Sequence, residues 1–368
     1  MRTEIGATYR AEPVGSLLRP EYLKEAVQRH EAGVLSAEEL AGVQDRAVRE
    51  AVALQEECGL DVLTDGEMRR WSWSDPLTRG LTGFERQALS PVPFTRESGR
   101  AQVQPRLPAV TARLGPGPNL PLAEWRFLQG LTARPTKVTL PSLSYASVLW
   151  VPEVSSRAYP TRAEYLADAL RLLRAQVEEL VAAGVRYIQL DAPRYTHLVS
   201  EEGLANFRRL GIDPATWLDE MVALDNALIA GFPGVTFGLH LCRGNSRSMW
   251  SVEGGYDPIA ERLFNTIHVQ RLLLEYDTPR AGTFAPLRFV PKDKVVVLGL
   301  ITTKEPELES ADLLKRRVEE ASQYIPLERL ALSPQCGFAS TLPGNLITPE
   351  VQRAKLERLV EVTRSIWG

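Results

Sequence analysis

The sequence predicts an α/β fold of the (β/α)8 TIM-type barrel class. Short apolar segments typical of buried strands alternate with long amphipathic segments typical of helices along most of the 368 residues. The strand candidates are residues 12–16, 61–64, 108–114, 137–140, 185–190, 235–242, 269–275, 294–301 and 329–333. These are nine candidates for the eight strands of a barrel, so we expect at least one to be peripheral or not a strand. A doubly wound open sheet is the alternative fold.

Two helix–strand units are the clearest elements. Residues 36–39 read Ser-Ala-Glu-Glu, which is a capping box, and Gly59 ends the following amphipathic helix just before a strand candidate. The same order recurs farther along, where residues 161–164 begin a helix, Gly184 ends it, and the strand candidate 185–190 follows. Helices and strands that alternate in this way indicate parallel βαβ units.

We interpret residues 1–368 as one catalytic barrel domain. The segment at about 71–135 is rich in Pro, Gly, Arg and Gln and has weak periodicity. We therefore expect it to be an insertion-like excursion over the barrel after the second strand.

The composition argues against several classes of protein. Lys plus Arg total 43 and Asp plus Glu total 46, so the net charge of -3 offers no basic surface for nucleic acid. No signal peptide and no apolar run of about 18 residues is present, so we expect a cytoplasmic protein without a membrane span. Three cysteines are too few for a disulfide framework and are available as thiols for packing, metal binding or catalysis.

In a (β/α)8 barrel the reactive side chains lie at the carboxyl ends of the strands. The polar residues that the predicted strands place there are Ser16, Asp65, Glu67, Asp191, His240, Cys242, Glu275, Asp277 and Cys336. His240 and Cys242 are two residues apart, so in a strand both side chains point to one face. With Cys336 and Glu275 they complete a tetrahedral set of ligands typical of zinc.

Such a site suits thiol chemistry. Two thiolates and a carboxylate make zinc a weak Lewis acid for activating water but a good holder of a thiolate nucleophile. A substrate thiol could displace the weakest ligand, which we expect to be Glu275. The alternatives are a packing role for each cysteine and a salt bridge for Glu275. His197 lies on a loop at the same end and is a further candidate, with no role assigned.

Six motifs resemble those of the cobalamin-independent methionine synthase family, in the order of that family. They are Val14-Gly-Ser-Leu-Leu-Arg-Pro20, Asp61-Val-Leu-Thr-Asp-Gly-Glu-Met-Arg-Arg70, Tyr187-Ile-Gln-Leu-Asp-Ala-Pro193, Leu239-His-Leu-Cys-Arg-Gly-Asn245, Leu273-Leu-Glu-Tyr-Asp-Thr-Pro-Arg-Ala-Gly282 and Leu332-Ser-Pro-Gln-Cys-Gly-Phe-Ala-Ser340. The resemblance implies that His240, Cys242, Glu275 and Cys336 bind Zn²⁺. It also implies that Ser16, Glu67 and Asp191 hold homocysteine, although the two carboxylates could instead pair with Arg69, Arg70 or Arg194.

The chain departs from the family in its methyl-donor region. Full-length members have two barrels, and this chain resembles only the catalytic one. Ala192 stands where the family has a carboxylate, and Leu143 stands where it has a folate-stacking Trp. The resemblance therefore implies a methyl donor that is a simpler folate or another compound. Trp71 and Trp73 are among the aromatic residues that could replace the stacking surface.

The sequence thus predicts a zinc-dependent methyltransferase that transfers a methyl group to homocysteine and gives methionine. One alternative is a zinc enzyme that alkylates another thiol, such as coenzyme M. The other is a non-catalytic zinc-binding protein that binds a partner protein at the barrel mouth. That function would require an exposed apolar patch around Trp71, Trp73 and Phe94.

Overall fold

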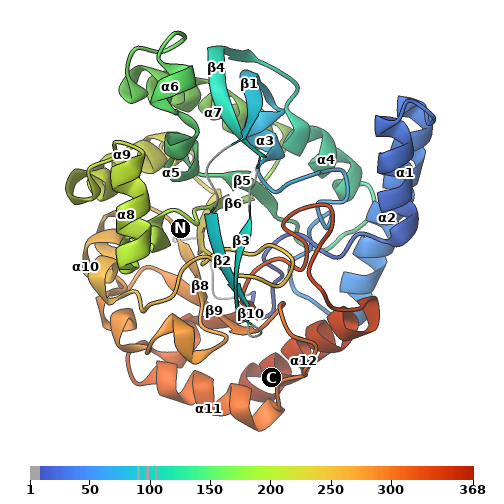
Figure 1. Ribbon diagram of the computed structural model, residues 1–368. Coiled ribbons are helices and arrows are strands. Elements are labelled where there is room, and N and C mark those ends of the chain that lie inside the picture. The colour runs from blue at the N-terminus through green and yellow to red at the C-terminus, as the bar shows by residue number, and fades with distance from the viewer. Residues whose placement is uncertain (1–8, 89–91, 97–98, 104–105) are drawn as a thin grey trace.

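The computed structural model describes residues 9–88, 92–96, 99–103 and 106–368. A parallel six-stranded sheet lies at its centre in the order β10-β9-β8-β7-β6-β5 (Figure 1). The strands are β5 (Val138–Pro141), β6 (Tyr187–Asp191), β7 (Thr236–Leu241), β8 (Arg271–Glu275), β9 (Val295–Ile301) and β10 (Leu330–Pro334). Each agrees with a predicted strand to within two residues.

The two N-terminal strand candidates do not form regular strands. They contribute single parallel bridges, Ala11 to Leu332 of β10 and Leu63 to Thr136 just before β5. The prediction of a strand over 12–16 is wrong. Pro13 has no amide hydrogen to donate, and side-chain donors bond to carbonyls of this segment in place of a neighbouring strand. Lys137 Nζ donates to the Pro13 carbonyl, at 2.5 Å. The observed architecture is α/β with six parallel strands, and a closed eight-stranded barrel stays a prediction.

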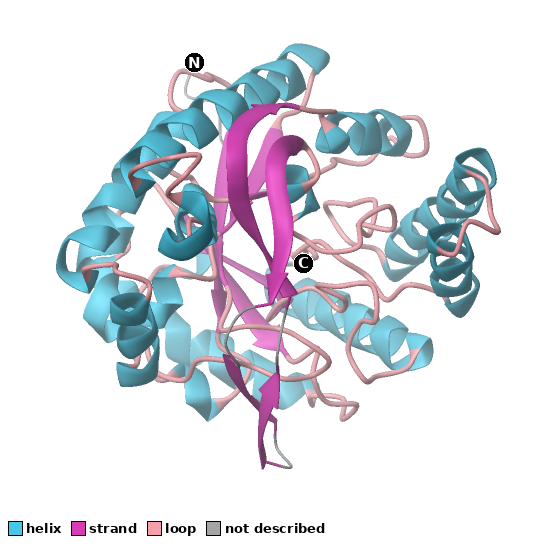
Figure 2. Cartoon of the chain, turned by 45° about the horizontal axis from the view of Figure 1, so that its top comes forward, coloured by secondary structure: helices cyan, strands magenta, loops and turns pink. Residues whose placement is uncertain are grey.

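The candidate at 108–114 is the peripheral one. It lies in β4 (Arg106–Pro116), which pairs antiparallel with β1 (Leu81–Ala88) outside the central sheet. A second antiparallel pair, β2 (Val92–Arg96) and β3 (Gly99–Val103), continues in line with the first, as Figure 2 shows. The backbones of Thr95 and Trp250 exchange hydrogen bonds of 2.7 and 2.9 Å, which attaches β2 to the loop after β7.

Helices surround the strands (Figure 1). They are α1 (Glu21–Glu31), α2 (Ala37–Cys58), α3 (Asp75–Thr78), α4 (Leu120–Gln129), α5 (Leu143–Ala146), α6 (Pro152–Ser155), α7 (Arg162–Ala183), α8 (Glu201–Arg209), α9 (Pro214–Ile229), α10 (Asp257–Thr266), α11 (Ala311–Ser322) and α12 (Pro349–Trp367). Ser36 and Glu39 form the predicted capping box, and Gly59 and Gly184 end α2 and α7 in the left-handed conformation. Within the described ranges, no helix combines the length and apolarity needed to cross a bilayer.

The two faces of the sheet have separate cores. Leu239 and Leu272 belong to the large core that the helices complete. A small second cluster, consisting of Leu273, Val295, Val297 and Ala331, lies on the opposite face, which we call the inner face. Because strand side chains alternate, Arg271 and Glu275 lie on the inner face with Leu273 between them. The inner face therefore carries charged groups at both ends of the strands and an apolar layer between them.

Candidate metal and substrate site

Three predicted ligands meet at the carboxyl end of the sheet. His240 is near the end of β7, Cys242 follows it on the same face, and Cys336 lies just beyond β10. One ligand atom from each lies within 4.8 Å of the others, and all three residues are buried. No nitrogen or oxygen of the described residues bonds to either imidazole nitrogen of His240, and the polar partner of the ring is the Cys336 thiol. A buried imidazole without an oxygen or nitrogen partner indicates a missing ligand.

The two sulfurs interact strongly. Cys242 Sγ lies 3.4 Å from Cys336 Sγ. Their contact lowers the pKa of Cys336 well below the usual value for a thiol and raises the pKa of Cys242, so the pair favours sharing one proton. Two sulfurs and an imidazole are the donors of many zinc sites, so the residues present fit Zn²⁺.

Glu275, the predicted fourth ligand, lies beside this group rather than in it. The carboxylate is fully buried at the end of β8. It accepts a hydrogen bond of 2.8 Å from the Arg243 backbone amide and another of 3.0 Å from the Arg280 guanidinium. It also interacts electrostatically with His240 and Cys242. Glu275 is thus held close to the three ligands by donors of its own.

Lys304 is a charged residue of the site that the sequence analysis missed. Its side chain is 2% exposed and its ammonium has no hydrogen-bond partner. It interacts electrostatically with Glu275, Cys242 and Cys336. The strand-end rule could have found it, because Lys304 lies three residues beyond the end of β9.

Ser16 lies against the segment that carries Cys336. Its hydroxyl accepts a hydrogen bond of 3.4 Å from the Ala339 amide. A Cβ atom on Gly337 would lie 2.1 Å from the Ser16 hydroxyl, so only glycine allows the two segments to come this close. The structure therefore places Ser16 next to the metal candidates.

Glu67 is held in a strained and specific orientation. Its φ angle is 55°, in the left-handed region that residues other than glycine rarely adopt. Thr139 donates a hydrogen bond of 2.8 Å to Oε1, and a Cβ on Gly15 would lie 2.7 Å from the same oxygen. Oε2 is buried without a partner. One oxygen of Glu67 is thus fixed while the other is free for a ligand.

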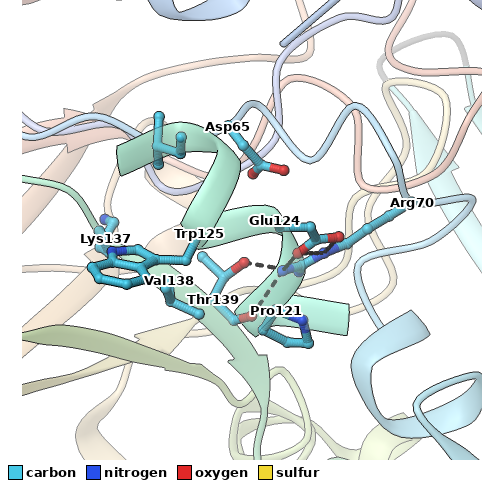
Figure 3. A pocket seen from close by; sticks show the side chains of 9 residues that line it. Asp65, Arg70, Pro121, Glu124, Trp125, Lys137, Val138 and Thr139 are labelled. Carbon is cyan, nitrogen blue, oxygen red and sulfur yellow. Dashed lines mark hydrogen bonds and ion pairs between the residues drawn. The ribbon is translucent and has the colours of Figure 1, made fainter. Parts of the chain in front are cut away.

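Arg70 bonds to the same threonine, and Figure 3 shows its guanidinium beside Glu124 and Thr139. Its guanidinium pairs with Glu124 of α4 at 2.7 Å and donates to the Thr139 hydroxyl at 2.9 Å. The distance from Arg70 to Glu67 is longer, at 3.5 Å. Asp65 lines the same pocket, and burial together with the nearby Glu124 raises its pKa to about 7. The main ion pair of Arg70 is therefore with Glu124, not with Glu67.

Asp191 ends β6 beside His240 of β7. The Gln189 side chain donates a hydrogen bond of 2.7 Å to its Oδ1. Burial raises the pKa of Asp191 to about 7, and the carboxyl also interacts with His240 and Glu67. The structure therefore brings the three substrate candidates and the three metal candidates to one end of the sheet.

The aromatic residues proposed for an exposed patch are each covered in part. Trp71, Trp73 and Phe94 are all partly buried. Arg86 lies over the Trp71 ring at 4.5 Å, and Trp73 packs on Tyr145 with ring centroids 4.5 Å apart. Both tryptophan rings are thus covered in part by other side chains, and an exposed apolar patch around these residues stays a prediction.

Comparison with known proteins identifies the family. Residues 153–364 match the family described as cobalamin-independent synthase, catalytic domain. The chain is 38% identical to the Bacillus subtilis protein named uncharacterized protein YxjH, over 98% of this chain and 95% of that protein. The chain belongs to the cobalamin-independent methionine synthase family. The resemblance seen in the sequence motifs is thereby confirmed.

Other relatives agree with this membership. A methionine synthase of Saccharolobus solfataricus is 24% identical over 96% of this chain and 93% of its own length. A Listeria monocytogenes structure, described as a candidate vitamin-B12 independent methionine synthase, matches with 29% identity and a TM-score of 0.72 over 98% of both chains. A Shewanella B12-independent methionine synthase, solved with selenomethionine, shares the fold at 19% identity, with a TM-score of 0.73 over 98% of this chain and 97% of that one. Family and neighbours together indicate a methionine synthase-like methyltransferase.

Proposed function

We propose that this protein transfers a methyl group to the thiol of homocysteine, with Zn²⁺ as its metal and methionine as its product. The observation that carries this proposal is the group of His240, Cys242 and Cys336 within 4.8 Å of one another. The relatives named methionine synthase support the choice of reaction.

The metal would be held by His240, Cys242 and Cys336, with Glu275 as the fourth ligand. When bound, zinc lowers the pKa of a thiol and so keeps it as the nucleophilic thiolate at neutral pH. Arg280 and the Arg243 amide already hold the Glu275 carboxylate, and they can keep it when the substrate thiol takes its place. The buried cation of Lys304 offsets part of the negative charge that collects here.

The amino-acid part of homocysteine would lie on the three other predicted residues. Glu67 Oε2 is buried without a partner and can accept from the substrate ammonium together with Asp191. Ser16 and nearby backbone amides can meet the substrate carboxylate. Holding both ends of the substrate orients its sulfur toward the methyl donor, and such orientation lowers the barrier of a bimolecular step.

We also propose that the sheet closes as a (β/α)8 barrel in one domain of residues 1–368, with 71–135 as the excursion. The bridges of Ala11 to β10 and of Leu63 to Thr136 support closure, as does the 2.9 Å hydrogen bond from the Asp61 amide to the Ala11 carbonyl. The methyl donor is a folate or another small compound. Leu143 is fully buried in the core and is not available to stack on a folate.

Metal analysis and thiol titration test the proposed reaction. The purified protein should bind one Zn²⁺, and the cobalt-substituted protein should change its sulfur-to-metal absorption when homocysteine is added. Coenzyme M should cause no such change, because it has no ammonium for Glu67 and Asp191. A response to coenzyme M and none to homocysteine would contradict the proposal.

A further inference from the structure

Arg194 is a partly buried cation that no carboxylate of the described residues pairs with. It lies three residues after Asp191, at the start of the short helix η2 (Tyr195–Val199). Its Nε atom is buried and has no hydrogen-bond partner. Among the described residues no carboxylate pairs with it, and the Tyr145 ring lies 5.8 Å from the guanidinium. Burying a guanidinium without a counter-ion is unfavourable.

The other arginines buried at the sheet ends are held by a carboxylate or, as with Arg19 and Arg243, by several backbone carbonyls. Arg70 pairs with Glu124 at 2.7 Å, Arg271 with Glu12 at 2.6 Å, and Arg280 with Asp277 at 2.8 Å, as shown by the ion pairs of the described chain. Arg194 differs from all of these, since its one hydrogen-bond partner among the described residues is His197. The fold therefore supplies carboxylate or carbonyl acceptors at the other positions and leaves the Arg194 guanidinium largely without them.

His197, for which the sequence analysis assigned no role, contacts Arg194. Its Nε2 lies 3.2 Å from Arg194 Nη1. Because the guanidinium can only donate, Nε2 accepts and the hydrogen of the neutral ring is on Nδ1. Burial and the Arg194 charge lower the pKa of His197 well below its usual value, which keeps the ring neutral. Nδ1 is buried and also has no partner.

This pair lies beside the proposed reaction site. The hydroxyl of Thr196, between the two residues, donates a hydrogen bond of 2.7 Å to the Cys242 carbonyl. The Ala192 amide donates to the His240 carbonyl, at 2.9 Å. The segment from Asp191 to His197 is thus attached to the strand that carries two metal candidates. An anion bound there would lie at the same end of the sheet as the proposed thiol site.

We propose that Arg194 and His197 bind an oxyanion, a carboxylate or a phosphate, of the methyl donor. The assignment to the methyl donor rests on the proposed function, whereas the anion site itself does not. A guanidinium binds such groups in a planar, two-point geometry, and the imidazole adds a neutral donor. Homocysteine is the less suitable source of this anion, because its carboxylate is assigned to Ser16 and the nearby backbone amides in the proposed function.

Anion binding and stability test the site without metal or turnover. We would titrate the wild type with glutarate and with inorganic phosphate by calorimetry, and repeat both titrations with Arg194→Met and Arg194→Lys. We expect one of the two anions to bind the wild type at least about tenfold more tightly than Arg194→Met, with partial rescue by Arg194→Lys. The better anion identifies the group as carboxylate or phosphate. Arg208→Met, on an exposed position of α8, is the matched control.

Thermal unfolding supplies the second measurement. Without anion, Arg194→Met should unfold at the same or a higher temperature than the wild type, because it removes a partly buried charge that has no counter-ion. An anion should raise the unfolding temperature of the wild type more than that of Arg194→Met, with an intermediate rise in Arg194→Lys. Equal anion binding by both proteins, or a clear loss of stability in Arg194→Met, would overturn the site and assign Arg194 to the structure.

Kinetics then test the assignment to the donor. Arg194→Met should raise the KM for the methyl donor about tenfold and leave the KM for homocysteine unchanged. A rise in the KM for homocysteine alone would move the site to the amino acid and overturn the assignment. Anion binding without any methyltransferase activity would instead count against the proposed function and leave the anion site standing.

Discussion

The two ends of the central sheet differ in whether their buried polar and charged groups have partners. At the amino end, Glu12 accepts hydrogen bonds from Lys137 at 2.9 Å, Arg271 at 2.6 Å and Tyr187 at 2.8 Å, and all of these side chains are buried. At the carboxyl end, several buried polar atoms have no oxygen or nitrogen partner among the described residues, namely Glu67 Oε2, Gln189 Oε1, both nitrogens of His240, Arg194 Nε, His197 Nδ1 and Lys304 Nζ. The complete network stabilises the fold, and the incomplete one is available to ligands.

An apolar layer on the inner face separates the complete polar network of the amino end from the incomplete one of the carboxyl end. Leu273, Val295, Val297 and Ala331 fill the inner face between Arg271 and Glu275. This apolar layer separates the cations of the amino end from the thiols and carboxylates of the carboxyl end. Each end can therefore be changed without rearranging the other, and mutations should separate stability from function.

Removal of the Glu12 charge should have the largest effect. Glu12→Gln leaves Lys137 and Arg271 buried without their anion, so we expect the free energy of unfolding to fall by about 3–5 kcal/mol. Urea unfolding measures this loss, and Glu25→Gln, on an exposed position of α1, should change stability by less than about 0.5 kcal/mol. A similarly small change in Glu12→Gln would mean that the amino end is not the stabilising region.

The pH dependence of this loss sharpens the prediction. Burial alone would raise the pKa of Glu12, but the ion pairs with Arg271 and Lys137 lower it to about 2. A lowered pKa contributes stability that is complete above the unfolded value of 4.5 and is lost as the pH falls toward about 2. The difference between wild type and Glu12→Gln should therefore be constant at neutral pH and narrow progressively below about pH 4.5.

At the other end, Cys336→Ser should weaken metal binding and leave the fold intact. Loss of a direct ligand should cost more than the 10- to 100-fold typical of outer partners, so we expect at least about 100-fold lower Zn²⁺ affinity. Competition with a chelator measures it. Cys58→Ser, at a buried cysteine in the core of α2, should keep full metal binding. Full metal occupancy in Cys336→Ser would show that the ligand assignment is wrong.

Asp225 is an intermediate case, a buried carboxyl that has hydrogen-bond donors but no cationic partner in the described part of the chain. It accepts from Tyr195 and from the Leu143 amide, both at 2.7 Å, and burial raises its pKa to about 7. A raised acid pKa gives stability at low pH that is lost as the pH rises from 3.8 to about 7. Between about pH 5 and 7, this group should cost the wild type about 2 kcal/mol. Unfolding at several pH values should show that Asp225→Asn lacks this decline.

The candidate ligands at the carboxyl end could be predicted from the sequence, whereas the interactions that hold the residues around them could not. Strand alternation and the strand-end rule were enough to select His240, Cys242 and Cys336, because the ligands are rare residue types at regular positions. The same rules could not show that Glu275 is held by Arg280, or that no carboxylate of the described residues pairs with Arg194, since both depend on loops far apart in the chain. The amino-end network was missed because Glu12 meets Arg271 across 259 residues.

Thr139→Val should have the smallest effect. It tests whether substrate binding at the carboxyl end depends on the orientation of the Glu67 carboxylate. The Thr139 hydroxyl donates to Glu67 at 2.8 Å and accepts from Arg70 at 2.9 Å, so its loss frees Glu67 while keeping the side-chain volume. If Glu67 binds the substrate ammonium, the KM for homocysteine should rise about tenfold with kcat almost unchanged, because ground state and transition state lose the same contact. Thr363→Val, at a buried hydroxyl in α12, controls for the loss of a hydrogen bond as such. An equal fall in kcat and kcat/KM would instead mean that Glu67 stabilises the transition state. The unpaired groups of the carboxyl end would then contribute to the chemical step as well as to binding.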